Sequence, residues 1–254
     1  MTRLAALALL WNMTLVPAEP GFLAPWMSRQ RWFANKGGLP VLEDIGRVEL
    51  TSSEPGVRVG IHLLLDHTAG KPSLYQVPLT YRDAPLEGAE AAMVGMLGPV
   101  YVYDGPYDQA FTSALLEVVL HERELHGDDV WALGHRTSTI GAERSVSRVL
   151  SGEQSNTSII FEPVGGGTPV ICKLFRALHH GDNPDVELQT ALALAGSEAV
   201  PRSVGDLVAD WRDTGEASGR ARGHLAFAQE FLPGVRDAWR VALDAARAGT
   251  DFSA

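Results

Sequence analysis

The sequence predicts an α+β fold in which antiparallel sheets carry a few helices, and three observations support this. Short alternating or β-branched segments recur, most clearly at 43–50 and 74–81. Tight returns such as the glycine run 165–167 connect them. Helical spacing is confined to a few short stretches. The 254 residues are 45% hydrophobic and 20% charged, an ordinary globular composition sufficient for one large domain or two small ones.

The first predicted unit, residues 14–104, is an antiparallel sheet with one or two helices. The expected elements are a short helix at 15–27 and strands at 41–50, 57–65, 74–81 and 100–103. The segment before it, 1–13, contains an apolar run of eight residues, which is too short for a membrane span. No cleavage site follows, so we interpret the segment as an extension or a misplaced start codon rather than an export signal.

The second predicted unit, residues 105–236, contains another antiparallel sheet. An amphipathic helix at 110–124 leads into it, followed by a polar connector at 127–140 that we expect to be poor in strands. The expected elements then follow in chain order: strands at 145–150, 158–163 and 170–175, a helix at 184–194, and strands at 207–211 and 224–231. Residues 237–254 begin a further helix.

Residues 151–187 are the most informative stretch. In the apolar strand 170–175, alternation places Lys173 on the face of Ile171 and Phe175, where its ammonium needs an anionic partner. Asn183 is a good N-cap, so Glu187 lies about one turn into the next helix, and we predict a Lys173–Glu187 ion pair. In that helix Ala191 and Leu194 share the side of Glu187, and Leu188 and Leu192 lie on an adjacent side, so the helix can pack and still direct Glu187 sideways.

A polar turn precedes this strand. Its backbone N–H groups, the hydroxyls of Ser151, Ser155 and Thr157, and the Asn156 amide offer donors to an anion. The turn is not a Walker A loop, because the Gly-Lys-Ser/Thr ending is absent. A strand lysine paired with a helix glutamate is how kinase-like folds hold lysine toward nucleotide phosphates. We therefore predict a phosphate site, although an ordinary surface lysine beside a polar turn remains the alternative.

Four motifs, in this order along the chain, resemble bacterial maltokinases, which belong with the aminoglycoside-phosphotransferase-like kinases. They are Arg-Gln-Arg-Trp-Phe-Ala-Asn-Lys-Gly at 29–37, Tyr-Gln-Val-Pro-Leu-Thr-Tyr-Arg at 75–82, Gly-Glu-Gln-Ser-Asn-Thr-Ser at 152–158, and the segment 173–187. The resemblance implies a cystatin-like N-terminal cap for the first unit and a protein-kinase-like N-lobe for the second. It also implies that residues 229–233 occupy the hinge that contacts adenine.

By this resemblance, the complete enzyme transfers phosphate from ATP to maltose, giving maltose 1-phosphate in the route from trehalose to glycogen-type glucans. The implied ATP-binding residues are Ser151, Gln154, Ser155, Asn156, Thr157, Lys173, Glu187, Gln229, Phe231 and Leu232. The family's catalytic loop and magnesium ligands lie in a C-terminal lobe, and this chain stops before them. We therefore expect an ATP-binding portion that is inactive alone, takes maltose only if that lobe is supplied, and has no catalytic or metal-binding residue of its own.

Two His-Gly-Asp triplets, at 126–128 and 180–182, are not the catalytic loop, because neither follows the hinge; we interpret them as polar loops and helix capping. The cations Arg29, Arg31 and Lys36 are expected at the surface and in contacts between cap and core rather than in a phosphate site.

The net charge of −10 disfavours binding to nucleic acid or anionic membranes. Cys172 is the sole cysteine, so no internal disulfide can form and a reducing cytoplasm fits; its thiol is expected to point into the core. Two other functions stay open. One is a non-catalytic binding or regulatory module whose open face is covered by a partner or a second copy, and the other is a kinase of another sugar such as glucosamine.

Overall fold

The computed structural model describes residues 19–141, 144–150, 155–213, 215–235 and 238–249. The predicted extension at 1–13 lies outside these ranges. Within them, no helix combines the length and the apolar character needed to cross a bilayer.

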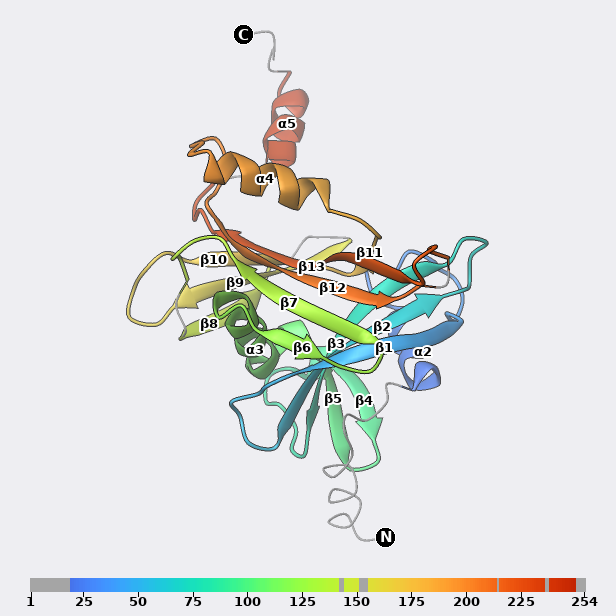
Figure 1. The fold of residues 1–254 in the computed structure, drawn as a ribbon. Coiled ribbons are helices and arrows are strands. Elements are labelled where there is room, and N and C mark those ends of the chain that lie inside the picture. The colour runs from blue at the N-terminus through green and yellow to red at the C-terminus, as the bar shows by residue number, and fades with distance from the viewer. Residues whose placement is uncertain (1–18, 142–143, 151–154, 214, 236–237, 250–254) are drawn as a thin grey trace.

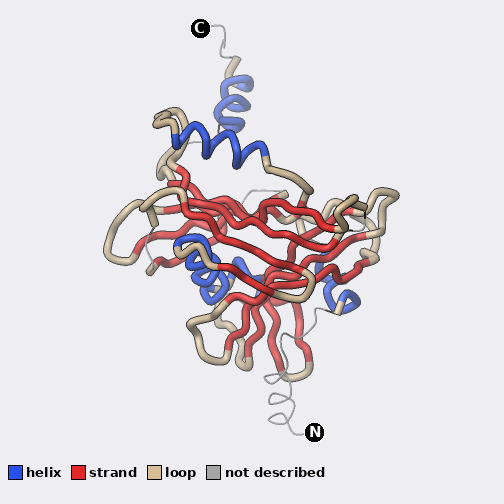
Figure 2. The backbone as a smooth tube through the Cα atoms, in the orientation of Figure 1, coloured by secondary structure: helices blue, strands red, loops and turns tan. Residues whose placement is uncertain are grey.

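Among the described residues, the strands form two antiparallel sheets (Figure 2), which confirms the predicted α+β class. The first sheet has six strands in the order β1-β2-β3-β5-β4, with β11 added beside β3. The second has seven strands in the order β6-β7-β12-β13-β10-β9-β8. Neighbouring strands are mostly consecutive hairpins, as short connections favour.

The strands of the first sheet are β1 Leu42–Leu50, β2 Val57–Asp66, β3 Ser73–Arg82, β4 Met93–Leu97, β5 Val100–Asp104 and β11 Ala177–Leu178. Those of the second are β6 Glu124–His126, β7 Val130–Arg136, β8 Ser145–Val149, β9 Asn156–Pro163, β10 Val170–Phe175, β12 Ser203–Arg212 and β13 Arg220–Glu230. The helices are α2 Pro20–Met27, α3 Gln109–Leu120, α4 Pro184–Leu194 and α5 Ala238–Arg247, with short 3₁₀ turns at Glu90–Ala92 and Gly105–Tyr107.

The layers are arranged around α3. This helix packs against strands of both sheets, while α4 lies on the opposite side of the second sheet (Figure 1). Residues on most sides of α3 are buried, among them Phe111, Leu115 and Val119. One hydrophobic core therefore runs from the first sheet through α3 into the second sheet.

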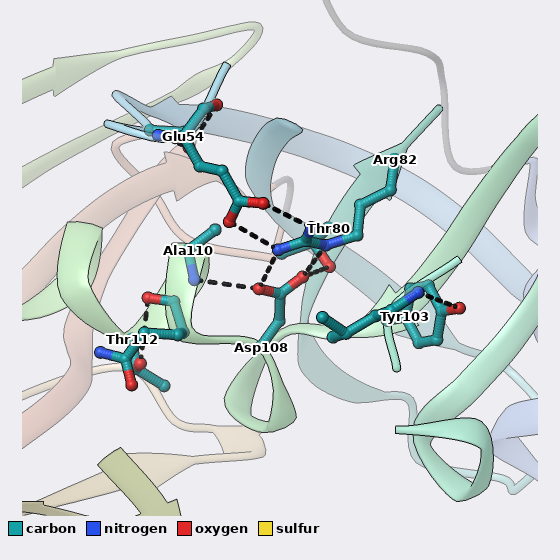
Figure 3. Close-up of polar contacts among 10 residues, drawn as sticks. Glu54, Thr80, Arg82, Tyr103, Asp108, Ala110 and Thr112 are labelled. Atoms are coloured by element: carbon teal, nitrogen blue, oxygen red, sulfur yellow. Dashed lines mark hydrogen bonds and ion pairs between the residues drawn. The ribbon is translucent and has the colours of Figure 1, made fainter. Parts of the chain in front are cut away.

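A buried polar network fixes the start of α3 (Figure 3). Asp108 caps the helix by accepting a hydrogen bond from the Ala110 N–H at 2.9 Å. The same carboxylate forms a two-point ion pair with Arg82 at 2.6 and 2.7 Å and accepts a hydrogen bond from Thr80. The other edge of the Arg82 guanidinium donates to both carboxylate oxygens of Glu54. Each buried charge is thus paired, as burial requires.

The prediction that 127–140 is a strand-poor connector is wrong, because β7 is an interior strand of the second sheet, paired with β6 and β12. Its inward positions are Val130, Ala132 and Gly134, and its outward positions include Trp131 and Leu133, so the residue types hide the alternation. Gly134 is required by packing: a Cβ there would collide with the backbone carbonyl of Val118 in α3. The strands β4, β6 and β11 were also not predicted.

The two sheets are joined where the chain leaves β10. The next residue, Arg176, crosses between the sheets, and Ala177 and Leu178 then pair with Tyr75 and Leu74 of β3. The lysine-bearing strand of the second sheet therefore continues directly into a strand of the first.

Candidate functional site

Lys173 lies in β10 with its side chain on the face that α4 partly covers. The neighbours Cys172 and Leu174 point to the opposite face and are 2% and 0% exposed, whereas the Lys173 side chain is 34% exposed. The alternation predicted from the sequence is therefore observed. Burial raises the pKa of the Cys172 thiol to about 12, so this cysteine is a core residue, as expected.

The partner of Lys173 is Asp185, not Glu187. Lys173 Nζ lies 3.0 Å from Asp185 Oδ2, and the predicted Lys173–Glu187 pair is absent from the ion pairs of the described residues. Both carboxylates flank Val186, about 100° to either side of it on the helix. Val186 is the residue that packs onto the sheet, at 2% exposure. The way in which α4 lies on the second sheet therefore places Asp185, rather than Glu187, beside the lysine.

The helix also packs differently from the prediction. Its inward positions are Val186, Gln189, Thr190 and Ala193, at helical spacing, while Leu188, Leu192 and Leu194 are 62%, 37% and 69% exposed. Polar contacts fix this rotation. Gln229 of β13 donates to Gln189 at 2.7 Å, and the Thr190 and Ser203 hydroxyls lie 3.4 Å apart.

The predicted phosphate loop connects β8 to β9. Ser151 and Gln154 lie outside the described residues. Ser155 is exposed and Asn156 is half-buried, so both are open to a ligand.

Thr157 is on the other face of β9. Its hydroxyl is buried and accepts a hydrogen bond from Arg176 Nε at 2.9 Å, and its register partner is Leu174. The predicted contact between the Thr157 hydroxyl and phosphate does not fit this orientation. The residue opposite Lys173 is instead Ser158, which the prediction missed and which is also buried, at 1% exposure. Strand alternation places Ser158, two residues after Asn156, on the same face as Asn156. Both faces of β9 carry apolar residues, however, so the sequence did not show which face is the open one.

The hinge segment follows β13. Gln229 is half-buried and bonded to α4, and Phe231 is half-buried. The Phe231 N–H donates to the Pro169 carbonyl at 2.8 Å, so this donor is not free to contact adenine. Leu232 is 41% exposed and makes no backbone hydrogen bond to another described residue. The Leu232 N–H is therefore the better candidate for a hydrogen-bond donor to adenine.

Arg176 connects the candidate site to the first sheet. Its guanidinium is fully buried and donates through Nη2 to both Asp104 oxygens at 2.8 and 2.9 Å. It also lies over the Trp32 ring, 4.9 Å from the centroid. Arg176 thus links the end of β10, the start of β9 through Thr157, and the first sheet.

The motif at 29–37 has a structural role. Trp32 and Phe33 are buried against Tyr75 with ring centroids 5.8 and 5.3 Å apart, and Asn35 donates to Asp66 at 2.7 Å. These aromatic residues cover the face of the first sheet that α2 also covers. These contacts lie within the first sheet, and Arg29, Arg31 and Lys36 are exposed at its surface, as expected.

The His-Gly-Asp triplets are likewise structural. Asp128 pairs with Arg47 of β1 at 2.7 Å. His180 Nδ1 accepts the Arg222 N–H at 3.1 Å. Within the described ranges, no three His, Cys, Asp or Glu side chains are grouped so that they could hold a metal ion.

Comparison with protein families gives a match at residues 26–108 to the maltokinase N-terminal cap domain. Residues 26–108, which include β1–β5 of the first sheet, are a maltokinase-type N-terminal cap. The match includes β1–β5, the motif at 29–37 and the strand at 75–82, and it ends at Asp108, the N-cap of α3. It covers less than half of the chain; β6–β13 and α4, which carry Lys173, lie beyond it. The predicted maltokinase-type cap is confirmed, and it supports membership of the maltokinase family.

Proposed function

We propose that this chain binds ATP on the Lys173 face of the second sheet, as the nucleotide-binding portion of a maltokinase-like sugar kinase. The observation that carries the proposal is the ammonium of Lys173 on a partly open sheet face, held by Asp185 and placed beside Ser158 at the base of the hairpin loop. The maltokinase-type cap at 26–108 supports the same family of activities.

In this proposal each group has a defined task. The Lys173 ammonium contacts the phosphates as a point charge, and Asp185 fixes its direction while remaining 54% exposed itself. Backbone N–H groups of the loop, with Ser155 and Asn156, donate to phosphate oxygens.

Two predicted contributions change. Asp185 replaces Glu187 as the anchor of the lysine. Thr157 is no longer assigned a phosphate contact, and neither is Ser158, whose side chain is buried at 1% exposure.

The adenine would lie against the segment after β13. The Leu232 N–H is the proposed donor to the adenine edge, and Phe231 supplies apolar contact. Because the matched domain belongs to maltokinases, the acceptor in the complete enzyme would be maltose, with phosphate transferred from ATP to give maltose 1-phosphate. The described residues offer no cluster that fits magnesium, so no step is assigned to a metal here.

Isothermal titration calorimetry with ATP tests the proposal. The unmodified chain should bind ATP, and Lys173→Ala should abolish binding because it removes the main cation facing the phosphates. Asp185→Ala should weaken binding several-fold, whereas Glu187→Ala should have a smaller effect. Lys36→Ala is the control, since Lys36 is exposed and belongs to the segment before β1. Equal ATP affinity in the unmodified chain and Lys173→Ala would reject the proposal.

A second function, partner binding, is favoured by the exposed leucines of α4. Leu188 and Leu192, four residues apart and therefore on one side of the helix, are 62% and 37% exposed. They leave an apolar stripe that a partner could cover. Size-exclusion chromatography with light scattering, with and without ATP, separates the cases. A monodisperse oligomer that Leu188→Glu dissociates would favour a binding module, and a monomer that binds ATP would favour the kinase portion.

A further inference from the structure

A cavity of about 570 Å³ opens between the maltokinase-type cap and the second sheet, at the end where the turn joining β2 to β3 lies near the loop joining β12 to β13. Its volume falls in the range of small-molecule sites, about 300–1,000 Å³, and such sites prefer junctions between folding units. It shares no residue with the proposed ATP site.

The floor of this cavity is apolar. Ile45, Leu65 and Leu74 from three neighbouring cap strands line it, with Trp211 from β12. Leu65 and Leu74 are partly buried and pack against the core that fills the space between the sheets. The cavity is therefore the place where that core reaches the surface, and an apolar group bound there would remove leucine surface from water.

The acidic groups at the rim already have partners. Glu43 lies 2.9 Å from His67 Nε2, Asp213 accepts the Gly215 N–H at 2.8 Å, and Glu216 lies 3.9 Å from His180 Nε2.

Unlike the acidic groups, the cationic groups at the rim have no partner among the described residues. The side chains of Lys71 and Arg212 are exposed and form no hydrogen bond or ion pair with another described residue. The unsatisfied groups around the apolar floor are therefore donors with positive charge, which favour an anionic acceptor.

We propose that this cavity binds a small amphipathic anion. Its carboxylate or phosphate group would accept hydrogen bonds from Lys71 and Arg212, and its apolar body would lie on Leu65 and Leu74. Because the site and the ATP face have no residue in common, the inference stands whether or not the chain binds ATP.

A matched series of ligands with one apolar chain and different head groups tests this proposal. Octanoate, octan-1-ol and octylamine are titrated into the full chain by calorimetry, and the site is located by amide NMR shifts. We expect octanoate to bind most tightly and to shift the amides of Lys71, Leu74 and Gly215. Octyl phosphate is the fourth ligand. Comparing its affinity with that of octanoate shows whether the cavity prefers a phosphate or a carboxylate head group.

The variants Lys71→Ala and Arg212→Ala should each weaken octanoate about three- to fivefold, as for exposed charge pairs, and leave octan-1-ol unchanged. Both residues are exposed, so the fold should tolerate the changes. Lys36→Ala, a change at an exposed cap lysine outside the cavity, is the control, and Lys173→Ala should also leave octanoate binding intact. Octylamine binding as tightly as octanoate, unchanged octanoate affinity in both rim variants, or no binding at these amides would each overturn the proposal.

Discussion

Replacing Arg176 with leucine tests the connection between the maltokinase-type cap and the second sheet. The change removes a fully buried guanidinium and leaves the Asp104 carboxylate, 3% exposed, without its partner. The Thr157 hydroxyl loses its donor and the Trp32 ring loses its cation. Leucine retains part of the apolar stem, so the main loss is electrostatic.

The expected cost follows from the burial of the pair. Breaking a buried ion pair by removing one partner costs about 3–5 kcal/mol, since the remaining charge stays desolvated. For a chain of this size, such a loss corresponds to a decrease in Tm of about 10 °C. Thermal unfolding followed by near-UV circular dichroism measures it.

The pH dependence provides a second measurement. Burial raises the pKa of the Asp104 carboxyl, and Arg176 opposes that rise, so removing Arg176 should raise this pKa further. A carboxyl whose pKa is higher in the folded than in the unfolded state lowers stability once the pH exceeds its unfolded pKa, about 3.9. The loss caused by Arg176→Leu should therefore be largest at neutral pH and shrink as the pH falls toward about 4.

Two further variants make the result decisive. Arg176→Leu combined with Asp104→Leu should recover much of the lost stability, since no unpaired charge remains. Arg202→Leu is the control, because Arg202 pairs with Glu230 at the surface, and it should leave Tm nearly unchanged. If Arg176→Leu also left Tm nearly unchanged, or if the double variant were as unstable as the sum of the single variants, the described ion pair would not be the connection.

Two other predictions concern buried titratable groups. Burial lowers the pKa of His62 to about 3, so below about pH 6.5 the unfolded chain binds a proton that the folded chain does not. Stability should therefore fall as the pH drops from about 6.5 toward 3. The urea midpoint of the His62→Gln variant should fall less over this range than that of the unmodified chain. Burial raises the pKa of the Cys172 thiol to about 12. Iodoacetamide at about pH 8 should therefore leave the folded chain unmodified and label Cys172 only in urea, as mass spectrometry would show. Rapid labelling of the folded chain would contradict the buried position of Cys172.

Part of the site was predictable because strand alternation depends only on the backbone. The side chains of Lys173 and Cys172 had to lie on opposite faces of β10, and they do. The Asn183 cap likewise follows from residue type at a helix start, and its side chain accepts the Asp185 N–H at 3.0 Å. Strand β7 shows the opposite case: its outward positions carry Trp131 and Leu133 and one inward position is Gly134, so the hydrophobic pattern did not reveal this interior strand.

By itself, then, the sequence determined the α+β class, most of the strands, the orientation of Lys173 and the maltokinase-type cap, since these depend on local periodicity and local motifs. The tertiary structure decided which carboxylate meets the lysine, which hydroxyl of β9 lies beside it, and that Arg176 joins the two sheets. The physical reason is that these contacts depend on how α4 packs on the second sheet and on the register between strands. The packing of segments distant in the sequence determines both the placement of α4 and the strand register, so neither can be predicted from a local pattern.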